Sequence, residues 1–289
     1  MIKTSTPIKK MTKMSVRWAF NWGEWSPSEK ELKLAVSCLQ LEEKARLAKF
    51  VFRKDLKASL IGRLLMRKFI NDSTKIPYDK IELERDKTTG RPILKNPSTP
   101  VSFNVSHQGN YTVLAGESED LKIGVDVMKL EYTGGKALPE FFRIMNRNFS
   151  SSEWNEIRGA PGTPESKQIA MFGRHWALKE SYVKALSVGI TVDLRELDFQ
   201  TQSDLRSDKV VADTILYERG VRRNWNFEET LIDSDHCVAV ALEIEKQKSH
   251  PQNNHFVVIK FEDLMKFAIP LHPEDDDFCK NYFGKAERP

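Results

Sequence analysis

Hydrophobic residues alternate with polar ones along some segments of the chain and recur at helical spacing along others. Alternation or a short continuous apolar run indicates a strand, whereas apolar residues three or four positions apart indicate a helix. These patterns predict strands over residues 16–22, 81–85, 92–94, 101–106, 111–116, 123–127, 197–199, 225–227, 237–242 and 255–261. They predict helices over 29–39, over 42–70 in two parts broken near Phe52, from Glu153 onward, and over 166–187. Residues 107–110 are predicted to form a turn.

The order of a strand, then helices, then strands occurs twice along the chain. This order predicts an α+β fold made of two similar halves. We expect a disordered N-terminal tail at 1–14, an N-terminal half at 15–121, a C-terminal half at 122–245, and a linker with a C-terminal extension at 246–289. The first acidic residue is Glu24, so a mitochondrial-targeting interpretation of the tail stays open beside the disordered one.

Composition narrows the class of protein. The chain has 289 residues, of which 40% are hydrophobic and 30% charged, which excludes a collagen-like, disordered or disulfide-scaffold protein. The net charge of +4 is small, so any anion-binding site must come from local clustering of charge. Cys38, Cys237 and Cys279 lie far apart, which favours reduced thiols in a cytosolic protein and gives no zinc motif. No apolar run reaches membrane-spanning length, so we expect no membrane partner.

Two basic segments are candidates for anion binding. Residues 44–68 are rich in Lys and Arg, and most of these side chains are expected to be a solvated helix surface. Some of them are candidates to recognise phosphate, because an Arg side chain presents a fork of N–H donors. Gly90 and Arg91 follow Arg85 and Lys87 at a tight turn, where backbone amides and cations can approach an anion together. An ordinary hairpin turn is the simpler alternative for the second segment.

Polar residues interrupt two apolar strands and one long helix. Asn104, Ser106 and His107 stand at the exit of the first strand. Asp126 lies within the second, where an isolated buried charge needs a partner or a cation. Glu180 and Lys184 are one helical turn apart, which by itself is typical of a surface ion pair. Together with Asp126, they form a set that can hold Mg²⁺ and a phosphate.

Three motifs in order carry a resemblance to a known family. They are Phe103-Asn104-Val105-Ser106-His107, Gly124-Val125-Asp126, and Trp176-Ala177-Leu178-Lys179-Glu180-Ser181-Tyr182-Val183-Lys184. From about residue 16 to 242 the chain resembles surfactin-type 4′-phosphopantetheinyl transferases. The C-terminal extension resembles that of animal members and implies no catalytic role.

The resemblance implies a pseudo-dimeric α+β fold whose halves enclose one coenzyme A site. The implied reaction moves 4′-phosphopantetheine from coenzyme A to a serine of an acyl- or peptidyl-carrier domain, of the fatty acid synthase or aminoadipate-semialdehyde dehydrogenase type, and releases adenosine 3′,5′-bisphosphate. It implies that Asp126 and Glu180 bind Mg²⁺ (or Mn²⁺), that Glu180 is the base toward serine, and that Lys184 stabilises charge on the pyrophosphate. The implied coenzyme-binding residues, besides these three, are Arg46, Arg85, Lys87, Gly90, Arg91, Asn104, Ser106 and His107. A monomer is expected, since both halves lie in one chain.

The chain departs from the family pattern at two positions. Met128 stands where many bacterial members have a second acid, and Arg91 stands where Lys is common. Mg²⁺ keeps water ligands readily, so two carboxylates with water complete its shell, and Gln108 is a candidate to orient one such water. Two other functions stay open from the residues alone. One is a nucleic-acid-binding module that uses residues 44–68, and the other is a Mg²⁺-dependent nucleotide phosphohydrolase.

Overall fold

The elements of the chain follow the same order twice. The computed structural model describes residues 13–97, 99–132, 134–187, 192–244 and 254–287. The first half consists of β1 (Ser15–Asn21), α1 (Glu29–Ser37), α2 (Leu41–Ala48), α3 (Arg53–Thr74), β2 (Leu83–Arg85), β3 (Pro92–Leu94), β4 (Ser102–Gln108) and β5 (Tyr111–Glu117). The second consists of β6 (Ile123–Lys129), α4 (Leu138–Met145), α5 (Ser151–Arg158), α6 (Glu165–Leu186), β7 (Leu197–Gln200), β8 (Ile215–Glu218), β9 (Val221–Arg222), β10 (Trp225–Leu231) and β11 (His236–Glu243).

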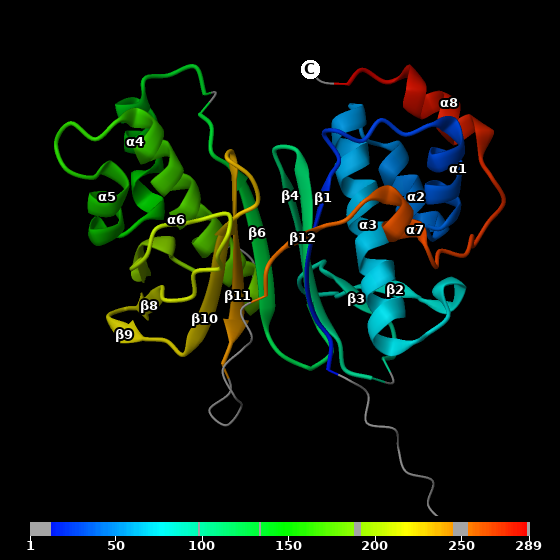
Figure 1. Ribbon diagram of the computed structural model, residues 1–289, viewed down its shortest axis with the longest axis horizontal. Helices are drawn as coiled ribbons and strands as arrows, with labels where there is room; N and C mark the ends of the chain where they lie inside the picture. The colour runs from blue at the N-terminus through cyan, green and yellow to red at the C-terminus, as the bar shows by residue number, and fades with distance from the viewer. Residues whose placement is uncertain (1–12, 98, 133, 188–191, 245–253, 288–289) are drawn as a thin grey trace, which may run out of the picture.

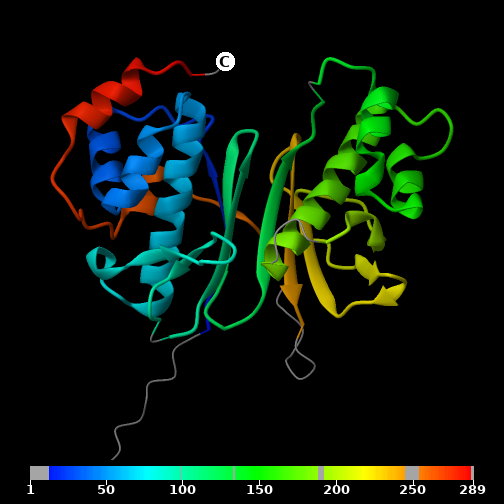
Figure 2. The ribbon, with the colours of Figure 1, turned by 180° about the vertical axis from the view of Figure 1, so that it is seen from behind.

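Each half contributes one main sheet, and the two sheets face each other at the centre of the molecule. One sheet has the order β12-β1-β5-β4, in which β12 (Val257–Val258) runs parallel to β1, and the other has the order β10-β11-β6. Helices α1–α3 cover the outer side of the first sheet and α4–α6 that of the second (Figures 1 and 2). An apolar layer between the sheets includes Ala19, Val113, Val125 and Val240. The α+β pseudo-dimer is therefore confirmed.

The long helices α3 and α6 occupy equivalent places and have the same length of 22 residues. Each carries one buried cation that binds carbonyl oxygens of the 3₁₀ turn after the helix. Arg67 of α3 donates to the carbonyls of Tyr78 and Ile81 over 2.5 and 3.2 Å. Lys179 of α6 donates to those of Leu194 and Leu197 over 2.7 and 2.8 Å. These matching contacts align α3 with α6, with Arg67 at the position of Lys179.

Most long elements lie where the hydrophobic pattern predicts them, but two predictions are wrong. Residues 107–110 are not all turn, because β4 continues through Gln108 and only Gly109 and Asn110 connect it to β5. Residues 255–261 are not one strand, because only Val257 and Val258 pair with β1 and Phe261 begins helix α7 (Phe261–Met265). The pattern also missed α4 and a helix in the extension, α8 (Asp276–Gly284).

The C-terminal extension packs on the helices of the first half. The ring of Phe261 stacks on Trp25 with centroids 5.1 Å apart, and the Ala286 carbonyl accepts a hydrogen bond of 2.9 Å from the Arg53 backbone N–H. The predicted tail at 1–14 and linker at 246–254 lie outside the described residues except for Lys13, Met14 and Asn254. Across the described ranges, no helix combines the length and apolar character that crossing a membrane requires.

Candidate active site

Strands β4 and β6 lie side by side along the seam between the halves, although they belong to different sheets. Residues two apart in a strand point to the same side, so alternate side chains of β4 reach across to β6. The Asn104 Oδ1 accepts a hydrogen bond of 2.9 Å from the Val125 backbone N–H. Ser106 donates to the Asp126 Oδ1 over 2.7 Å. The polar residues of the two strand motifs therefore meet at this seam.

Helix α6 reaches the seam because β6 has a glycine at the point of contact. A Cβ atom on Gly124 would stand 2.0 Å from the Ser181 carbonyl oxygen and 2.5 Å from the Ala185 nitrogen. Any larger residue would clash with the helix backbone, so this close approach requires glycine. The glycine thereby sets the distance between α6 and the neighbouring Asp126.

Asp126 is the buried acid of the seam, with a side chain that is 8% exposed. Lys184 of α6 places its Nζ 2.5 Å from the Asp126 Oδ1 and 2.9 Å from the Ser106 Oγ. The ammonium thus compensates the buried negative charge, which would otherwise be strongly unfavourable. Among the described residues, no side chain or backbone group donates to the Asp126 Oδ2. This second oxygen remains available to a ligand.

Glu180 lies one turn before Lys184 on α6 and is half-buried. Burial raises the pKa of its carboxyl group, the negative charge of Asp126 raises it further, and Lys184 opposes both effects. The two carboxylates are therefore close enough to repel each other. A cation placed between them would relieve this repulsion.

A basic cluster, made of Arg46, Arg63 and Arg85, lies beside the seam on the first half. Glu43 of α2 joins two of its members, with oxygen–nitrogen distances of 2.5 Å to Arg63 and 3.2 Å to Arg85. Burial lowers the pKa of Arg63, and the charges of Arg85 and Arg46 add to this effect. The Arg46 side chain is 47% exposed and therefore available to an anion. Because its position in the basic stretch resembles that of its neighbours, Arg63 could not be singled out from sequence.

His107 connects the basic cluster to the seam. Its side chain is exposed, yet it stands among protein atoms at the end of β4. Desolvation by these atoms lowers the pKa of His107, and the positive charges of Lys184 and Arg63 lower it further. The structure therefore places His107, Arg46 and Arg85, three of the residues that the sequence predicts to bind the coenzyme, around Arg63. Whether they bind it stays a prediction.

Arg91 joins segments of both halves. Its Nη1 donates to the Ser187 Oγ over 2.9 Å and to the Lys184 carbonyl over 3.3 Å. Its Nη2 donates to the Ile123 carbonyl over 3.1 Å and also to the Phe103 carbonyl. Arg91, like Asn104, therefore stabilises the seam in this structure. Contact of either side chain with the coenzyme stays a prediction.

Lys87 and Gly90 lie in the turn between β2 and β3. The Asp86 carboxylate accepts hydrogen bonds from the backbone N–H groups of Thr88 and Thr89 over 3.0 and 2.7 Å. Gly90 has a φ of +69°, which favours glycine, and Lys87 is exposed. A cavity of about 540 Å³, lined in part by Thr89, Arg91 and Ser187, lies beside this turn. There is therefore room for a ligand next to it.

Met128 stands where many bacterial members of the family have a second acid, and no carboxylate replaces that acid among the described residues nearby. Met128 packs against the apolar core of the second half. The Gln108 Oε1 accepts a hydrogen bond from the Lys129 backbone N–H, so its carbonyl oxygen already has a partner. Within the described ranges, no three His, Cys, Asp or Glu side chains gather as a metal cluster. Any cation at the seam would therefore have Asp126 and Glu180 as its protein carboxylates.

Lys179 shares the helix motif with Glu180 and Lys184 but faces another part of the molecule. It is fully buried, and its Nζ lies 2.8 Å from the Glu153 Oε2. Together with its two carbonyl contacts, this pair holds α6 against α5 and the turn before β7. Lys179 is therefore a structural residue of the motif.

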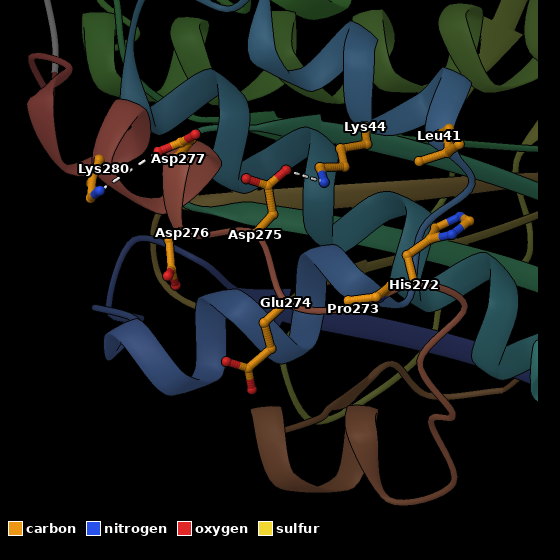
Figure 3. Close-up of a pocket in the computed structure, with 9 residues that line it drawn as sticks. All are labelled: Leu41, Lys44, His272, Pro273, Glu274, Asp275, Asp276, Asp277 and Lys280. Carbon is orange, nitrogen blue, oxygen red and sulfur yellow. Dashed lines mark ion pairs between the residues drawn. The ribbon is translucent and has the colours of Figure 1, made fainter.

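The acidic residues 274–277 are only partly the solvated run that the sequence indicates. They line a cavity of about 570 Å³ between the C-terminal extension and α2, which contributes Leu41 and Lys44 (Figure 3). Asp275 caps α8 by accepting from the Phe278 backbone N–H over 2.8 Å and also pairs with Lys44 of α2. The pair with Lys44 and the capping hydrogen bond both lower the pKa of Asp275. This acid therefore fastens the extension to the first half.

Comparison with known proteins identifies the family. A family model described as the N-terminal part of 4′-phosphopantetheinyl transferases matches residues 23–119. A second one, described as the 4′-phosphopantetheinyl transferase superfamily, matches residues 122–241. An L-aminoadipate-semialdehyde dehydrogenase-phosphopantetheinyl transferase of Xenopus laevis is 42% identical over 98% of this chain and 96% of its own length. The chain belongs to the 4′-phosphopantetheinyl transferase superfamily.

Other relatives extend the same similarity. The human protein of the same name is 42% identical over 95% of this chain and 93% of its own length. A 4′-phosphopantetheinyl transferase of Bacillus pumilus is 26% identical over 61% of this chain and 70% of its own length. The resemblance carried by the three motifs is thus confirmed, and the chain is a phosphopantetheinyl transferase. The motif residues of this transferase are the ones that meet at the β4–β6 seam.

Proposed function

We propose that this transferase moves the 4′-phosphopantetheine group of coenzyme A to a serine of an acyl- or peptidyl-carrier domain. The serine oxygen forms a bond to the phosphorus that carries pantetheine. The bond from this phosphorus to the bridging oxygen of the pyrophosphate breaks, and adenosine 3′,5′-bisphosphate leaves. The observation that carries the proposal is the meeting of Asp126, Glu180 and Lys184 at one seam. Phosphoryl transfer needs such positioning and charge neutralisation more than covalent chemistry by the protein.

The donor set at the seam fits a divalent cation. Asp126 and Glu180 offer hard oxygen ligands of the kind that Mg²⁺ binds, one Asp126 oxygen has no described partner, and the two carboxylates repel each other. We assign these two residues as the protein ligands of Mg²⁺, with Mn²⁺ as an alternative. When bound, the ion would neutralise charge on the pyrophosphate oxygens. Gln108 would orient a water there through its amide nitrogen, because its carbonyl oxygen is bonded to the Lys129 backbone N–H.

Glu180 is the proposed base toward the carrier serine. A serine hydroxyl is a poor nucleophile unless a nearby group accepts its proton. Burial and Asp126 raise the pKa of Glu180, which makes it a stronger base than an ordinary carboxylate. Lys184 holds an ammonium beside Asp126 and would stabilise negative charge on the leaving phosphate. These roles need no group from another chain except the serine itself.

The basic cluster is the proposed site for the nucleotide end of coenzyme A. Arg46 and His107 would contact the 3′-phosphate, because both are exposed beside the partly buried charges of Arg63 and Arg85. Lys87, Gly90 and Arg91 would line the nucleotide at the β2–β3 turn, together with Asn104 and Ser106 at the seam. The cavity beside that turn supports this placement.

The same structure supports the expected partners. Most cations of the basic stretch already have partners, as in the pairs Lys57–Glu287 and Lys68–Asp72, which argues against a nucleic-acid face. We propose a monomer, because both halves of the seam come from one chain. We also propose a cytosolic enzyme that binds neither nucleic acid nor membrane, in keeping with the buried free thiols of its cysteines.

A mass measurement on a carrier domain tests the proposal. An apo carrier domain incubated with the enzyme, Mg²⁺ and coenzyme A should gain the mass of one phosphopantetheine group. A carrier whose target serine is replaced by alanine is the matched control and should gain nothing. Cleavage of coenzyme A with no gain of mass on the carrier would contradict the proposal and favour transfer to water. A chelator that left the rate unchanged would contradict the assigned cation.

A further inference from the structure

The tip of the β4–β5 hairpin is attached to the second half by a histidine outside the three motifs. His236, the first residue of β11, is 1% exposed. Its Nε2 lies 3.2 Å from the Asn110 backbone nitrogen, and its Nδ1 lies 2.9 Å from the Asp233 Oδ1. The Asn110 N–H donates to Nε2, so the ring proton must be on Nδ1, where it is donated to Asp233. The carboxylate thereby fixes the tautomer that accepts the hairpin.

The hairpin is built to admit this ring. A Cβ atom on Gly109 would stand 2.2 Å from the His236 Nε2, and Gly109 has a φ of +62°, so this position requires glycine on both counts. Tyr111, directly after the turn, packs edge-on against the His236 ring with centroids 4.9 Å apart. Burial raises the pKa of Tyr111 to about 12, and the neighbouring Asp233 contributes to the shift. The residues on both sides of the turn therefore contact the second half.

A second attachment lies directly beside the first. Gln108 accepts a hydrogen bond from the Lys129 backbone N–H, and Lys129 is the register partner of His236 in the β6–β11 ladder. The hairpin tip is thus fixed at two adjacent points of the second sheet. His107 and Gln108, which immediately precede the tip, cannot shift along the seam without breaking one of these contacts.

We propose that His236 is a positioning residue for the coenzyme site. It holds the hairpin tip against the second half and thereby holds His107 at the place of the 3′-phosphate. This inference rests on the proposed function, because that function assigns the 3′-phosphate to His107. His236 itself contacts neither substrate. Replacing His236 should therefore weaken the binding of coenzyme A, which has the 3′-phosphate, and not that of dephospho-coenzyme A, which lacks it.

Two substitutions separate the hydrogen bond from the ring. His236→Phe keeps the aromatic contact with Tyr111 and removes the acceptor, whereas His236→Gln keeps an acceptor oxygen and removes the ring. Phe227→Leu, in the apolar core of the second half, is the control for a general loss of stability. For each protein we would measure hydrogen exchange at the Asn110 amide and titrate coenzyme A and dephospho-coenzyme A calorimetrically.

In His236→Phe, the Asn110 amide should exchange faster and the Kd for coenzyme A should rise by about three- to tenfold, as expected for the loss of one hydrogen bond. The Kd for dephospho-coenzyme A should change far less, His236→Gln should restore most of the loss, and Phe227→Leu should affect both ligands equally. Unchanged exchange at Asn110, or equal losses for both ligands in His236→Phe, would overturn the role of His236 and leave the proposed function standing. A wild-type protein that binds both ligands equally would refute the assignment of His107 and overturn this proposal with it.

Discussion

Replacing Gly124 by alanine tests whether the approach of α6 to β6 sets the geometry of the site. The new Cβ would lie 2.0 Å from the Ser181 carbonyl oxygen and 2.5 Å from the Ala185 nitrogen, both of which are backbone atoms of the helix. Neither atom can rotate away as a side chain can, so the helix itself must move outward. Restoring an ordinary contact requires a displacement of about 1 Å or more, and overpacking of this kind costs about 1–3 kcal/mol.

The displacement would be passed directly to the reacting groups. Glu180 and Lys184 lie on the same helix, each directly before one of the two contact residues, whereas Asp126 stays on the strand. A misplacement of about 1 Å can cost about 10²-fold in rate, so we expect kcat of Gly124→Ala to fall by about that factor. The free energy of unfolding should fall by only about 1–3 kcal/mol. Steady-state transfer to a carrier domain gives the first quantity, and denaturant unfolding gives the second.

Gly284→Ala is the matched control, because a Cβ there meets nothing within 4 Å. It should leave both kcat and stability close to those of the wild type. A folded Gly124→Ala protein with wild-type kcat would refute the reasoning. It would mean that the site does not depend on the separation of α6 from β6.

Further predictions concern single side chains of the site. Asp126→Ala should abolish metal-dependent turnover, and Glu180→Gln should lose activity that excess Mg²⁺ does not rescue; near-normal transfer by Glu180→Gln would remove this residue from the mechanism. In the metal-free protein, the Glu180 carboxyl group followed by NMR should have a pKa above the ordinary value of 4.5. Asp126→Asn should lower this pKa, since a repelling charge is removed. Because the base must be deprotonated, turnover should fall as the pH drops through this range, and a midpoint at or below 4.5 would contradict the shift. His107→Ala and Arg46→Ala should each weaken coenzyme A binding by about ten- to a hundredfold and barely change that of dephospho-coenzyme A, as calorimetry would show; equal losses would end the assignment. Lys179→Met should lower the free energy of unfolding by about 3–5 kcal/mol, because it leaves Glu153 buried without its cation, and wild-type stability would contradict its structural role.

The helical period explains why the sequence could predict that Glu180 and Lys184 lie together. Residues four apart share a face of a helix, which puts Glu180 and Lys184 together, whereas Lys179 points about 100° away from Glu180. The period also predicts that Lys179 faces another part of the molecule, and its burial against Glu153 agrees. The helical period does not predict which residues of other elements contact each face of the helix. The contacts of Arg91 with Phe103, Ile123 and Ser187 join segments remote in sequence, and no local pattern marks them.

Where the pattern failed, tertiary contacts or capping decided the structure. The β-branched and aromatic run 255–261 has strand propensity, but Phe261 instead begins α7 and stacks on Trp25. Strand propensity depends on such contacts more than on the backbone itself. The acidic run 274–277 is typical of a solvated surface and hides the start of α8, although Asp is also a preferred helix N-cap residue. Asp275 has that capping role.

Strands β1 and β10 also come from different halves, and a buried ion pair joins them. Arg17 of β1 stands between apolar neighbours as Asp126 does in β6, and it is buried between Glu228, 2.6 Å away, and Glu117, 2.8 Å away. The alignment of Arg67 with Lys179 places the pair Lys68–Asp72 where α6 has Glu180 and Lys184, with the charges reversed. Arg17 supplies a permanent positive charge to both carboxylates, so this cluster is structural, and breaking it would be strongly destabilising. This ion pair therefore joins the halves, whereas the β4–β6 seam, which needs β4 from one half and β6 with α6 from the other, cannot form in either half alone.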